Sequence, residues 1–155
     1  MLGKIKTIEE IRDFRICPVA RATEDVSIGT CEVFNMLRGY TSSDGYKIET
    51  DKHTFHVLIG NAQTCCEEWG YFSSDDNHKY FLGAELLEVN LTDKALNQTK
   101  VDESGYCAGY GGIQFVDFVT GRGVFQLAVH NYHNGYYGHP ILVAKDEDIL
   151  LNEVL

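Results

Sequence analysis

The chain has 155 residues, of which 44% are apolar and 12% aromatic, and it contains only two prolines. This composition is typical of one globular domain that buries a full core without disulfides, and it argues against long disorder. The formal net charge of −10 disfavours nucleic acid as a partner, because an acidic surface repels phosphate backbones, but a few local arginines could still hold a small phosphorylated ligand.

The first predicted element is a short helix near the N-terminus. In TIEEIRDF, residues 7–14, Thr7 is a candidate N-cap, Glu10 follows three residues later, and Ile11 and Phe14 form an apolar stripe. This is a capping-box pattern. Residues 15–30, RICPVARATEDVSIGT, are expected to be irregular. We therefore interpret residues 1–30 as a helical and irregular extension of a β-rich core over residues 31–145, within a single domain 1–155.

From about residue 30 the apolar residues recur with a period of two, which predicts strands. The Ser-Asp-Gly run in RGYTSSDGYK predicts a turn between the first two strands, and TDKH, residues 50–53, predicts the next. In GAELLEVNLTD, the side chains of Leu87, Val89 and Leu91 share one face. The candidate strands are TCEVFNML (30–37), YKIET (46–50), HTFHVLIG (53–60), GAELLEVNLTD (83–93) and HPILVAK (139–145).

The clearest strand pair is IQFVDFVTGRGVFQLAVHNYH, residues 113–133, in which two alternating runs flank the turn TGRG. ESGYCAGYGG, residues 103–112, is expected to be a loop, and EDILLNEVL, residues 147–155, a short C-terminal helix. Strands that follow one another without intervening helices predict an α+β domain, dominated by an antiparallel β-sheet and carrying one or two short helices.

The stretch NAQTCCEEWGY, residues 61–71, holds two adjacent cysteines, two carboxylates and the only tryptophan. Asn61 is positioned to cap a short helix there. The simplest interpretation is that Cys65 or Cys66 is a small buried apolar residue and that Trp69 plugs the sheet. A nucleophilic thiol is disfavoured, because the adjacent Glu67 and Glu68 oppose a thiolate.

No metal and no cofactor are predicted. The chain contains neither a C-x-x-C pair nor HExxH, and histidines three apart, such as His130 and His133, face opposite sides of a strand. The odd number of cysteines indicates free thiols in a cytoplasmic protein. The charged start MLGKIKTIEEIRDF is unlike a signal peptide, and the sequence lacks the roughly 18-residue apolar run of a membrane helix.

The second unusual stretch, HNYHNGYYGHP, residues 130–140, surrounds the turn dipeptide Asn134-Gly135 with aromatic side chains. Aromatic rings stack on planar bases, amides read base edges, and an arginine (Arg122, Arg38 or Arg21) would hold a phosphate. The predicted ligand-binding residues are Trp69, Tyr71, Arg122, His133, Asn134, Tyr136 and Tyr137.

These two stretches resemble a known family. QTCCEEWGY is similar to the Q-D-C-C-E run, and HNGYYG to the S-N-G-Y-Y-S run, of a small domain family of unknown function that is common in bacteriophage and prophage genomes. The resemblance covers residues 40–145. Thr64 replaces the expected acid and His133 replaces the expected serine. By analogy with small acidic phage proteins, the resemblance implies a stoichiometric role against host defence of the Thoeris or CBASS type.

Three functions follow as hypotheses. The first is an anti-defence protein that sequesters a signalling nucleotide, a cyclic ADP-ribose isomer or a cyclic oligonucleotide, without chemistry. The second is an acidic interaction protein that inhibits a host defence enzyme. The third is a nucleotide hydrolase that uses Glu67 or Glu68 with His130 or His133, and an enzyme is the least favoured of the three. A homo-oligomer is expected, because a pocket shared between subunits supplies more cations and more burial.

Overall fold

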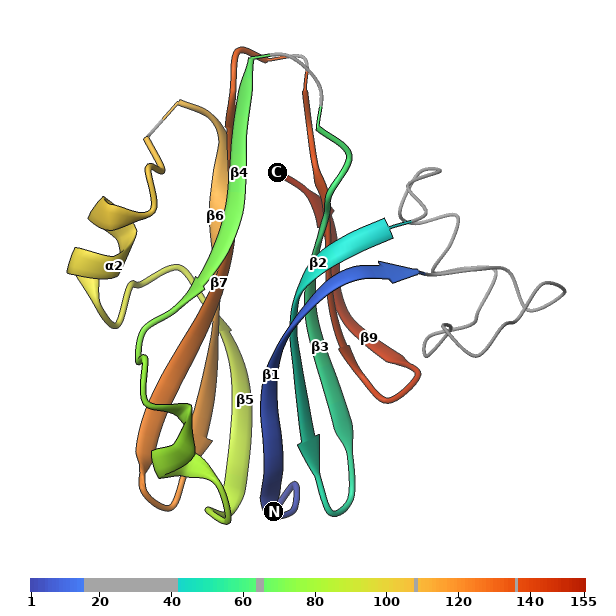
Figure 1. Ribbon diagram of the computed structural model, residues 1–155, viewed down its shortest axis with the longest axis vertical. Helices are drawn as coiled ribbons and strands as arrows, with labels where there is room; N and C mark the ends of the chain where they lie inside the picture. The colour runs from blue at the N-terminus through green and yellow to red at the C-terminus, as the bar shows by residue number, and fades with distance from the viewer. Residues whose placement is uncertain (16–41, 64–65, 108, 136) are drawn as a thin grey trace, which may run out of the picture.

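A computed structural model describes residues 1–15, 42–63, 66–107, 109–135 and 137–155, which form two antiparallel β-sheets packed face to face (Figure 1). The first sheet has the order β1-β2-β3-β8-β9, and its strands are Ile5–Arg15, Ser42–Thr50, Thr54–Gly60, Pro140–Lys145 and Asp148–Val154. The second has the order β4-β7-β6-β5, and its strands are Glu67–Ser73, Gly123–His133, Tyr110–Thr120 and Leu86–Thr92. The strand predicted over residues 30–37 lies outside the described residues.

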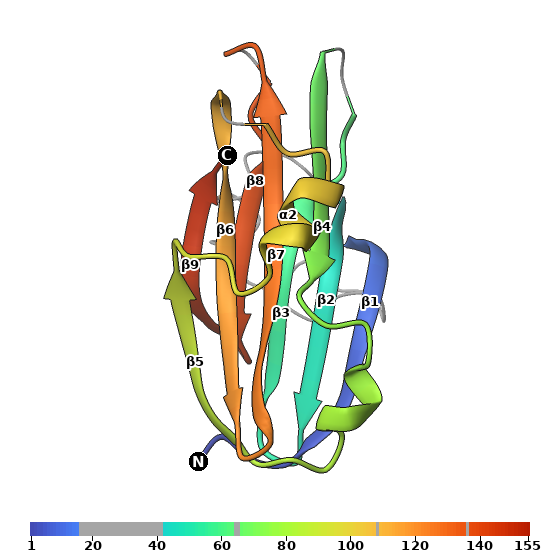
Figure 2. The ribbon, with the colours of Figure 1, turned by 90° about the vertical axis from the view of Figure 1, so that its left-hand side faces the viewer.

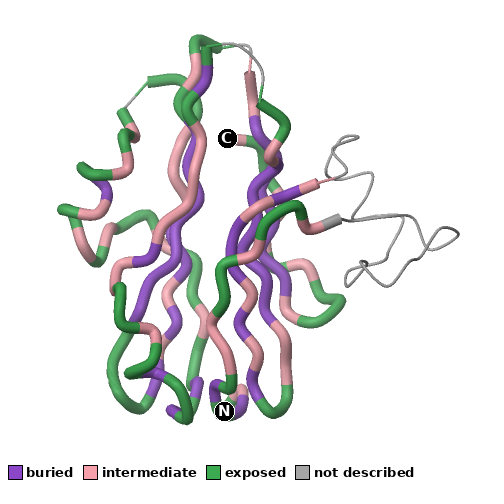
Figure 3. Tube along the Cα trace, viewed as in Figure 1, coloured by how far each residue is buried: buried purple, intermediate pink, exposed green. Residues whose placement is uncertain are grey.

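The main core fills the space between the two sheets, where buried residues run along the facing strands (Figure 3). Because side chains alternate along a strand, Phe55, Val57 and Ile59 of β3 point into this core together. At its centre the rings of Phe118 and Phe125 stack with centroids 5.0 Å apart. Burying one such side chain contributes about 1.5–3 kcal/mol.

The alternation of apolar residues correctly predicted the long hairpin β6–β7 and the strands β3, β5 and β8. The turn over residues 50–53 is confirmed by the hydrogen bond from the Thr50 N–H to the His53 carbonyl. One strand face was predicted less well: Val89 packs against the core, whereas Leu87 and Leu91 are exposed. The reason is that β5 lies at the edge of its sheet and has a register shift between Leu86 and Glu88.

Both predicted terminal helices are wrong, because each segment is an edge strand. Residues 7–14 belong to β1, where Ile8 pairs with Ile48 of β2, and the Thr7 hydroxyl donates to Glu49 instead of capping a helix. Residues 148–154 form β9, which pairs with β8. A helix of eight or nine residues is marginal in water, whereas a strand at the edge of a sheet completes the ladder of its neighbour.

Two further local predictions fail for a similar reason. The helix predicted after Asn61 is wrong for Glu67 and Glu68, which lie in β4, where the backbone pairs with β7; residues 64–65 lie outside the described residues. Ser43-Asp44-Gly45 lies inside β2, where Gly45 pairs with Leu58. A side chain at Gly45 would collide with the main-chain oxygen of Val57, so this glycine serves close strand packing and not a turn.

The two described helices are short and lie at other places than those predicted. The helix α2, Gln98–Glu103, covers the outer face of the four-stranded sheet (Figure 2), where Val101 packs with Phe115 and Ala128. A 3-10 helix, η2, spans His78–Phe81. The predicted loop 103–112 is therefore a loop only in its middle. The fold is more all-β than the predicted α+β class.

Candidate functional site

Side chains from both sheets line an acidic cleft of about 320 Å³ where the edge strand β4 lies opposite β1 and β2. Figure 1 looks onto this edge of the sandwich, with β4 on one side and β1 and β2 on the other. We call it the edge cleft; its lining residues are Glu10, Tyr46, Tyr71, Phe72, Ser73, Asp75, Asp76, His78 and Lys100. The cleft thus collects residues from β1, β2, β4, the loop into η2, and α2.

The strand registers explain why the two tyrosines and Glu10 meet. Glu10 of β1 is the cross-strand partner of Tyr46 of β2. Tyr71 of the opposite sheet donates a hydrogen bond from its hydroxyl to Glu10 Oε1 at 2.7 Å. The ring of Tyr71 meets the ring of Tyr46 edge-on, with centroids 5.4 Å apart. These contacts join the two sheets at the mouth of the cleft.

Tyr46 is the most deeply buried polar side chain of the cleft, with 6% of its surface exposed. Its ring contacts Tyr71 and His78, but its hydroxyl makes no hydrogen bond to any residue that the structure describes. Burial, together with the nearby Glu10, raises the pKa of Tyr46 above its ordinary value. The hydroxyl is therefore protonated at neutral pH and is available to a ligand as a donor and as an acceptor.

The charged groups of the cleft are already partly paired. Glu10 accepts from Nε and NH2 of Arg12 at 3.1 and 3.0 Å, and the hydrogen bonds from Tyr71 and then Arg12 lower the pKa of Glu10. Lys100 Nζ lies 2.7 Å from Asp76 Oδ1. Three carboxylates and one ammonium among the lining residues leave a formal charge of −2.

Ser73 and His78 form the arrangement in the cleft that most resembles a catalytic pair. His78 Nε2 lies 2.7 Å from Ser73 Oγ, and burial lowers the pKa of His78, which favours the neutral imidazole. However, the Ser73 hydroxyl also donates to the main-chain oxygen of Asp75 at 3.0 Å. The carboxylates of Asp75 and Asp76 would oppose an oxyanion. The pair is better explained as a brace of the loop after β4.

The structure divides the predicted ligand-binding residues among three places. Tyr71 lines the edge cleft. Trp69 lies further up β4, where its ring stacks on His139 with centroids 5.3 Å apart and its Nε1 donates to Gln63 Oε1 at 2.7 Å. Arg122 lies in the β6–β7 turn, where its NH1 donates to the main-chain oxygens of Tyr80 and Leu82 at 2.9 and 2.8 Å.

The remaining predicted residues lie at the far end of β7 from Arg122. Strand β7 has 11 residues, so roughly 35 Å separates Arg122 from His133, and these two cannot share a pocket in one chain. His133 Nδ1 accepts from the Gly135 N–H at 2.9 Å, and its ring stacks on Tyr110. Asn134 and Tyr137 follow directly. Tyr136, like Arg21 and Arg38, lies outside the described residues.

A buried pair that the sequence did not predict joins the sheets at this upper end. His139 Nε2 lies 2.9 Å from Glu67 Oε1, and both side chains are 1% exposed. His139 Nδ1 is hydrogen-bonded to the main-chain oxygen of Gly60. The carboxylate partner of His139 is thus Glu67, which the hydrolase hypothesis had placed with His130 or His133, and the pair is closed to a substrate.

The prediction of a buried cysteine is wrong for Cys66, which is exposed and has a positive φ of 64°. It precedes β4 at the surface, where Glu67 and not the thiol turns inward. Cys65 lies outside the described residues. Among the described residues, no group of three or more histidine, cysteine, aspartate and glutamate side chains is arranged to hold a metal ion.

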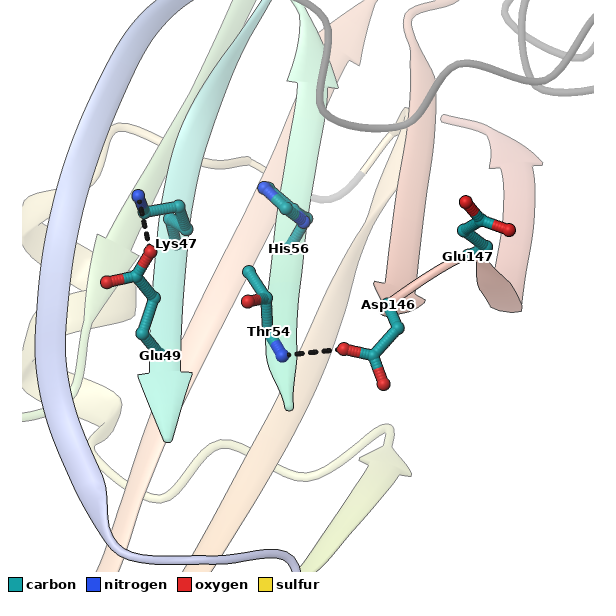
Figure 4. A pocket seen from close by; sticks show the side chains of 6 residues that line it. All are labelled: Lys47, Glu49, Thr54, His56, Asp146 and Glu147. Carbon is teal, nitrogen blue, oxygen red and sulfur yellow. Dashed lines mark hydrogen bonds and ion pairs between the residues drawn. The ribbon is translucent and has the colours of Figure 1, made fainter. Parts of the chain in front are cut away.

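A second pocket, of about 300 Å³, lies on the outer face of the five-stranded sheet (Figure 4). Its polar groups come from neighbouring strands, because Lys47 pairs with His56 and Glu49 with Thr54. Lys47 Nζ is 2.9 Å from Glu49 Oε1. His56 also lines this pocket, although both of its ring nitrogens are buried and have no hydrogen-bond partner within the described part of the chain.

The chain matches the model of a domain family of unknown function, DUF7448, over residues 1–143. No curated protein and no solved structure matches the chain. The sequence-based prediction of a domain family of unknown function is confirmed to this extent. Among the described residues, no helix is long and apolar enough to cross a membrane.

Proposed function

We propose that this chain, which belongs to the DUF7448 family, is a binding protein that holds its ligand in the edge cleft without chemical conversion. The observation that carries the proposal is Tyr46, whose nearly buried side chain lines an acidic cleft and whose hydroxyl has no partner among the residues that the structure describes. The hydroxyl oxygen itself is reached by solvent. A ligand that replaces its water hydrogen bond with a direct one would gain about 0.5–1.5 kcal/mol.

Binding is favoured over catalysis by the state of the groups in the cleft. Glu10 and Asp76 are each engaged by a cation, and Ser73 is shared between His78 and a main-chain oxygen. A general base must reach a substrate proton directly, whereas a binding site needs only complementary shape and charge. A nucleotide hydrolase built on Glu67 would also require the buried Glu67–His139 pair to open.

The charge of the cleft favours the acidic interaction protein among the hypotheses drawn from the sequence. Phosphate recognition requires cations, but Lys100 is held by Asp76 and Arg122 by main-chain oxygens. The formal charge of −10 would instead attract a basic surface and speed its association. In this proposal the protein is encoded by a phage, acts in the cytoplasm and inhibits a host defence enzyme.

Sequestration of a signalling nucleotide is the second candidate, and it has one specific observation in its favour. Tyr110 is 67% exposed, and its ring stacks on His133 with centroids 6.4 Å apart. Such a pair offers a platform on which a base can stack. A homo-oligomer in which another copy supplies an arginine at this platform would complete the phosphate site.

The test is a thermal-shift screen of the full chain with a basic peptide, cyclic dinucleotides, cyclic ADP-ribose isomers and NAD. A ligand at a hundred times its Kd adds about 2.7 kcal/mol of stability. We expect a shift that Tyr46→Phe reduces and that Tyr80→Phe, which removes an exposed hydroxyl in η2, leaves intact. The bound ligand should be recovered unchanged. A product that accumulates with time would instead establish an enzyme.

A further inference from the structure

We infer that the group bound in the edge cleft is a guanidinium, supplied by an arginine side chain of a partner protein. This inference rests on the proposed binding function of the cleft and names its ligand. The lining residues carry a formal charge of −2 within a chain of net charge −10. The local and the long-range fields therefore both attract a cation and repel a phosphate.

Two cations of the chain itself already bind at the rim of the cleft. The guanidinium of Arg12 donates two hydrogen bonds to Glu10, and the ammonium of Lys100 pairs with Asp76. These contacts show that the rim carboxylates accept nitrogen donors in the geometry they have. Arg12 and the Asp76 carboxylate are largely exposed, and exposed ion pairs contribute little to stability. An incoming cation can therefore replace Arg12 on Glu10 or Lys100 on Asp76 at a small cost in stability.

The shape of the cleft favours a guanidinium over an ammonium. The rings of Tyr46 and Tyr71 contact each other edge-on, with an interplanar angle of 89°, and both line the cleft. A planar guanidinium stacks on an aromatic face while its fork of donors reaches carboxylates and hydroxyls. An ammonium is a compact point charge that lacks this planar fork. The Tyr46 hydroxyl and Glu10 are acceptors that line the cleft.

The size of the cleft favours one side chain over a nucleotide. Its volume of about 320 Å³ lies at the lower limit of pockets that hold small molecules. A cyclic dinucleotide would bury only part of its surface there. An arginine side chain fits, with the rest of the partner protein lying against the surrounding acidic surface.

The experiment measures the affinity of the full chain for short fluorescent peptides that carry arginine, lysine or citrulline at one position. Citrulline is the matched control, because it keeps the shape of arginine and removes the charge. We expect the order arginine, lysine, citrulline, with a loss of about tenfold or more from arginine to citrulline. Affinity should fall with added salt, because the contacts are between charges.

Variants of the cleft residues test whether the peptide binds in the cleft. Glu10→Gln should weaken the arginine peptide about tenfold. Glu9→Gln is the matched control: it makes the same charge change one residue away, where Glu9 lies 3.9 Å from Lys47 instead of lining the cleft, and it should leave the affinity within about twofold. Arg12→Gln should strengthen binding, because it removes the internal competitor for Glu10.

The outcomes separate this inference from the function on which it rests. Equal affinity for the arginine and citrulline peptides, or equal effects of Glu10→Gln and Glu9→Gln, would overturn the guanidinium assignment. Agmatine that binds as tightly as the peptide would overturn the partner protein as its source. Binding of a nucleotide that Tyr46→Phe weakens and Glu10→Gln does not would refute this inference and leave the binding function standing. No binding by any peptide, amine or nucleotide would refute both.

Discussion

Two buried histidines should make the stability of this protein fall between pH 6.5 and pH 4. His56 lies on the outer face of the five-stranded sheet and His130 on the outer face of the four-stranded sheet, and they are 2% and 4% exposed. Nδ1 of each ring has no hydrogen-bond partner in the part of the chain that the structure describes. Burial is the main cause that lowers the pKa of each from 6.5 to about 4, because the charged imidazolium loses its hydration.

The sign and size of the effect follow from linkage. Since the folded pKa lies below the unfolded one, the unfolded state takes up protons first as the pH falls. Stability is therefore complete above pH 6.5 and is lost as the pH approaches 4. A difference of about 2.5 pKa units corresponds to about 3 kcal/mol for each histidine. Against a total of about 5–15 kcal/mol, the two together remove a large part of the stability of the domain near pH 4.

The assay is urea unfolding of the wild type and of His130→Leu at several pH values from 7.5 to 4.5. His130 is the cleaner site, because burial is the one cause that shifts its pKa, whereas Lys47 also acts on His56. Carboxylates titrate in both proteins, so the difference between the two curves isolates the histidine. We expect the unfolding free energy of the variant to rise by about 2–3 kcal/mol relative to that of the wild type between pH 7.5 and pH 4.5.

The matched control is His133→Leu, which removes a histidine that is only partly buried at the end of β7. Because this side chain is less buried than that of His130, its removal should change the pH dependence of the unfolding free energy by less than His130→Leu does. If His130→Leu also runs parallel to the wild type across this range, the buried imidazole is not a neutral group that resists protonation, and the reasoning from burial fails.

Three further predictions concern stability and can be measured by the same unfolding assay at pH 7. Glu67→Gln breaks a buried ionisable pair and should cost about 3 kcal/mol, whereas Glu68→Gln on the exposed side of β4 should change stability by less than about 0.5 kcal/mol. If the two substitutions had equal effects, the Glu67–His139 pair would not stabilise the packing of the two sheets. Gly45→Ala should cost about 2 kcal/mol or more, because its Cβ would meet a main-chain oxygen of β3, whereas Gly121→Ala has open space and should be nearly neutral. Arg122→Ala removes two hydrogen bonds to main-chain oxygens and should cost about 1–2 kcal/mol of stability. It should not change the affinity of the edge cleft for its ligand. A loss of affinity would show that Arg122 contributes to ligand binding.

The sequence alone determined the strands that carry a complete local signal. In β6 and β7 the apolar residues alternate on both sides of a glycine turn, and in β3 and β8 the runs are rich in Val, Ile and Leu. Such patterns predict strands because the side-chain period of two is a property of the backbone itself. The acidic surface and the domain family of unknown function were also predicted from residues alone.

Tertiary structure decided the short edge elements and the site. Residues 7–14 and 148–154 fit a helical turn about as well as a strand, and pairing with β2 and β8 selected the strand. The contact from Glu10 to Tyr71 spans 61 residues of sequence, and that from Glu67 to His139 spans 72. The sequence shows which chemical groups are present and which interactions each can make. Which side chains contact one another depends on strand order and register, because these set the distances between segments that lie far apart in the sequence.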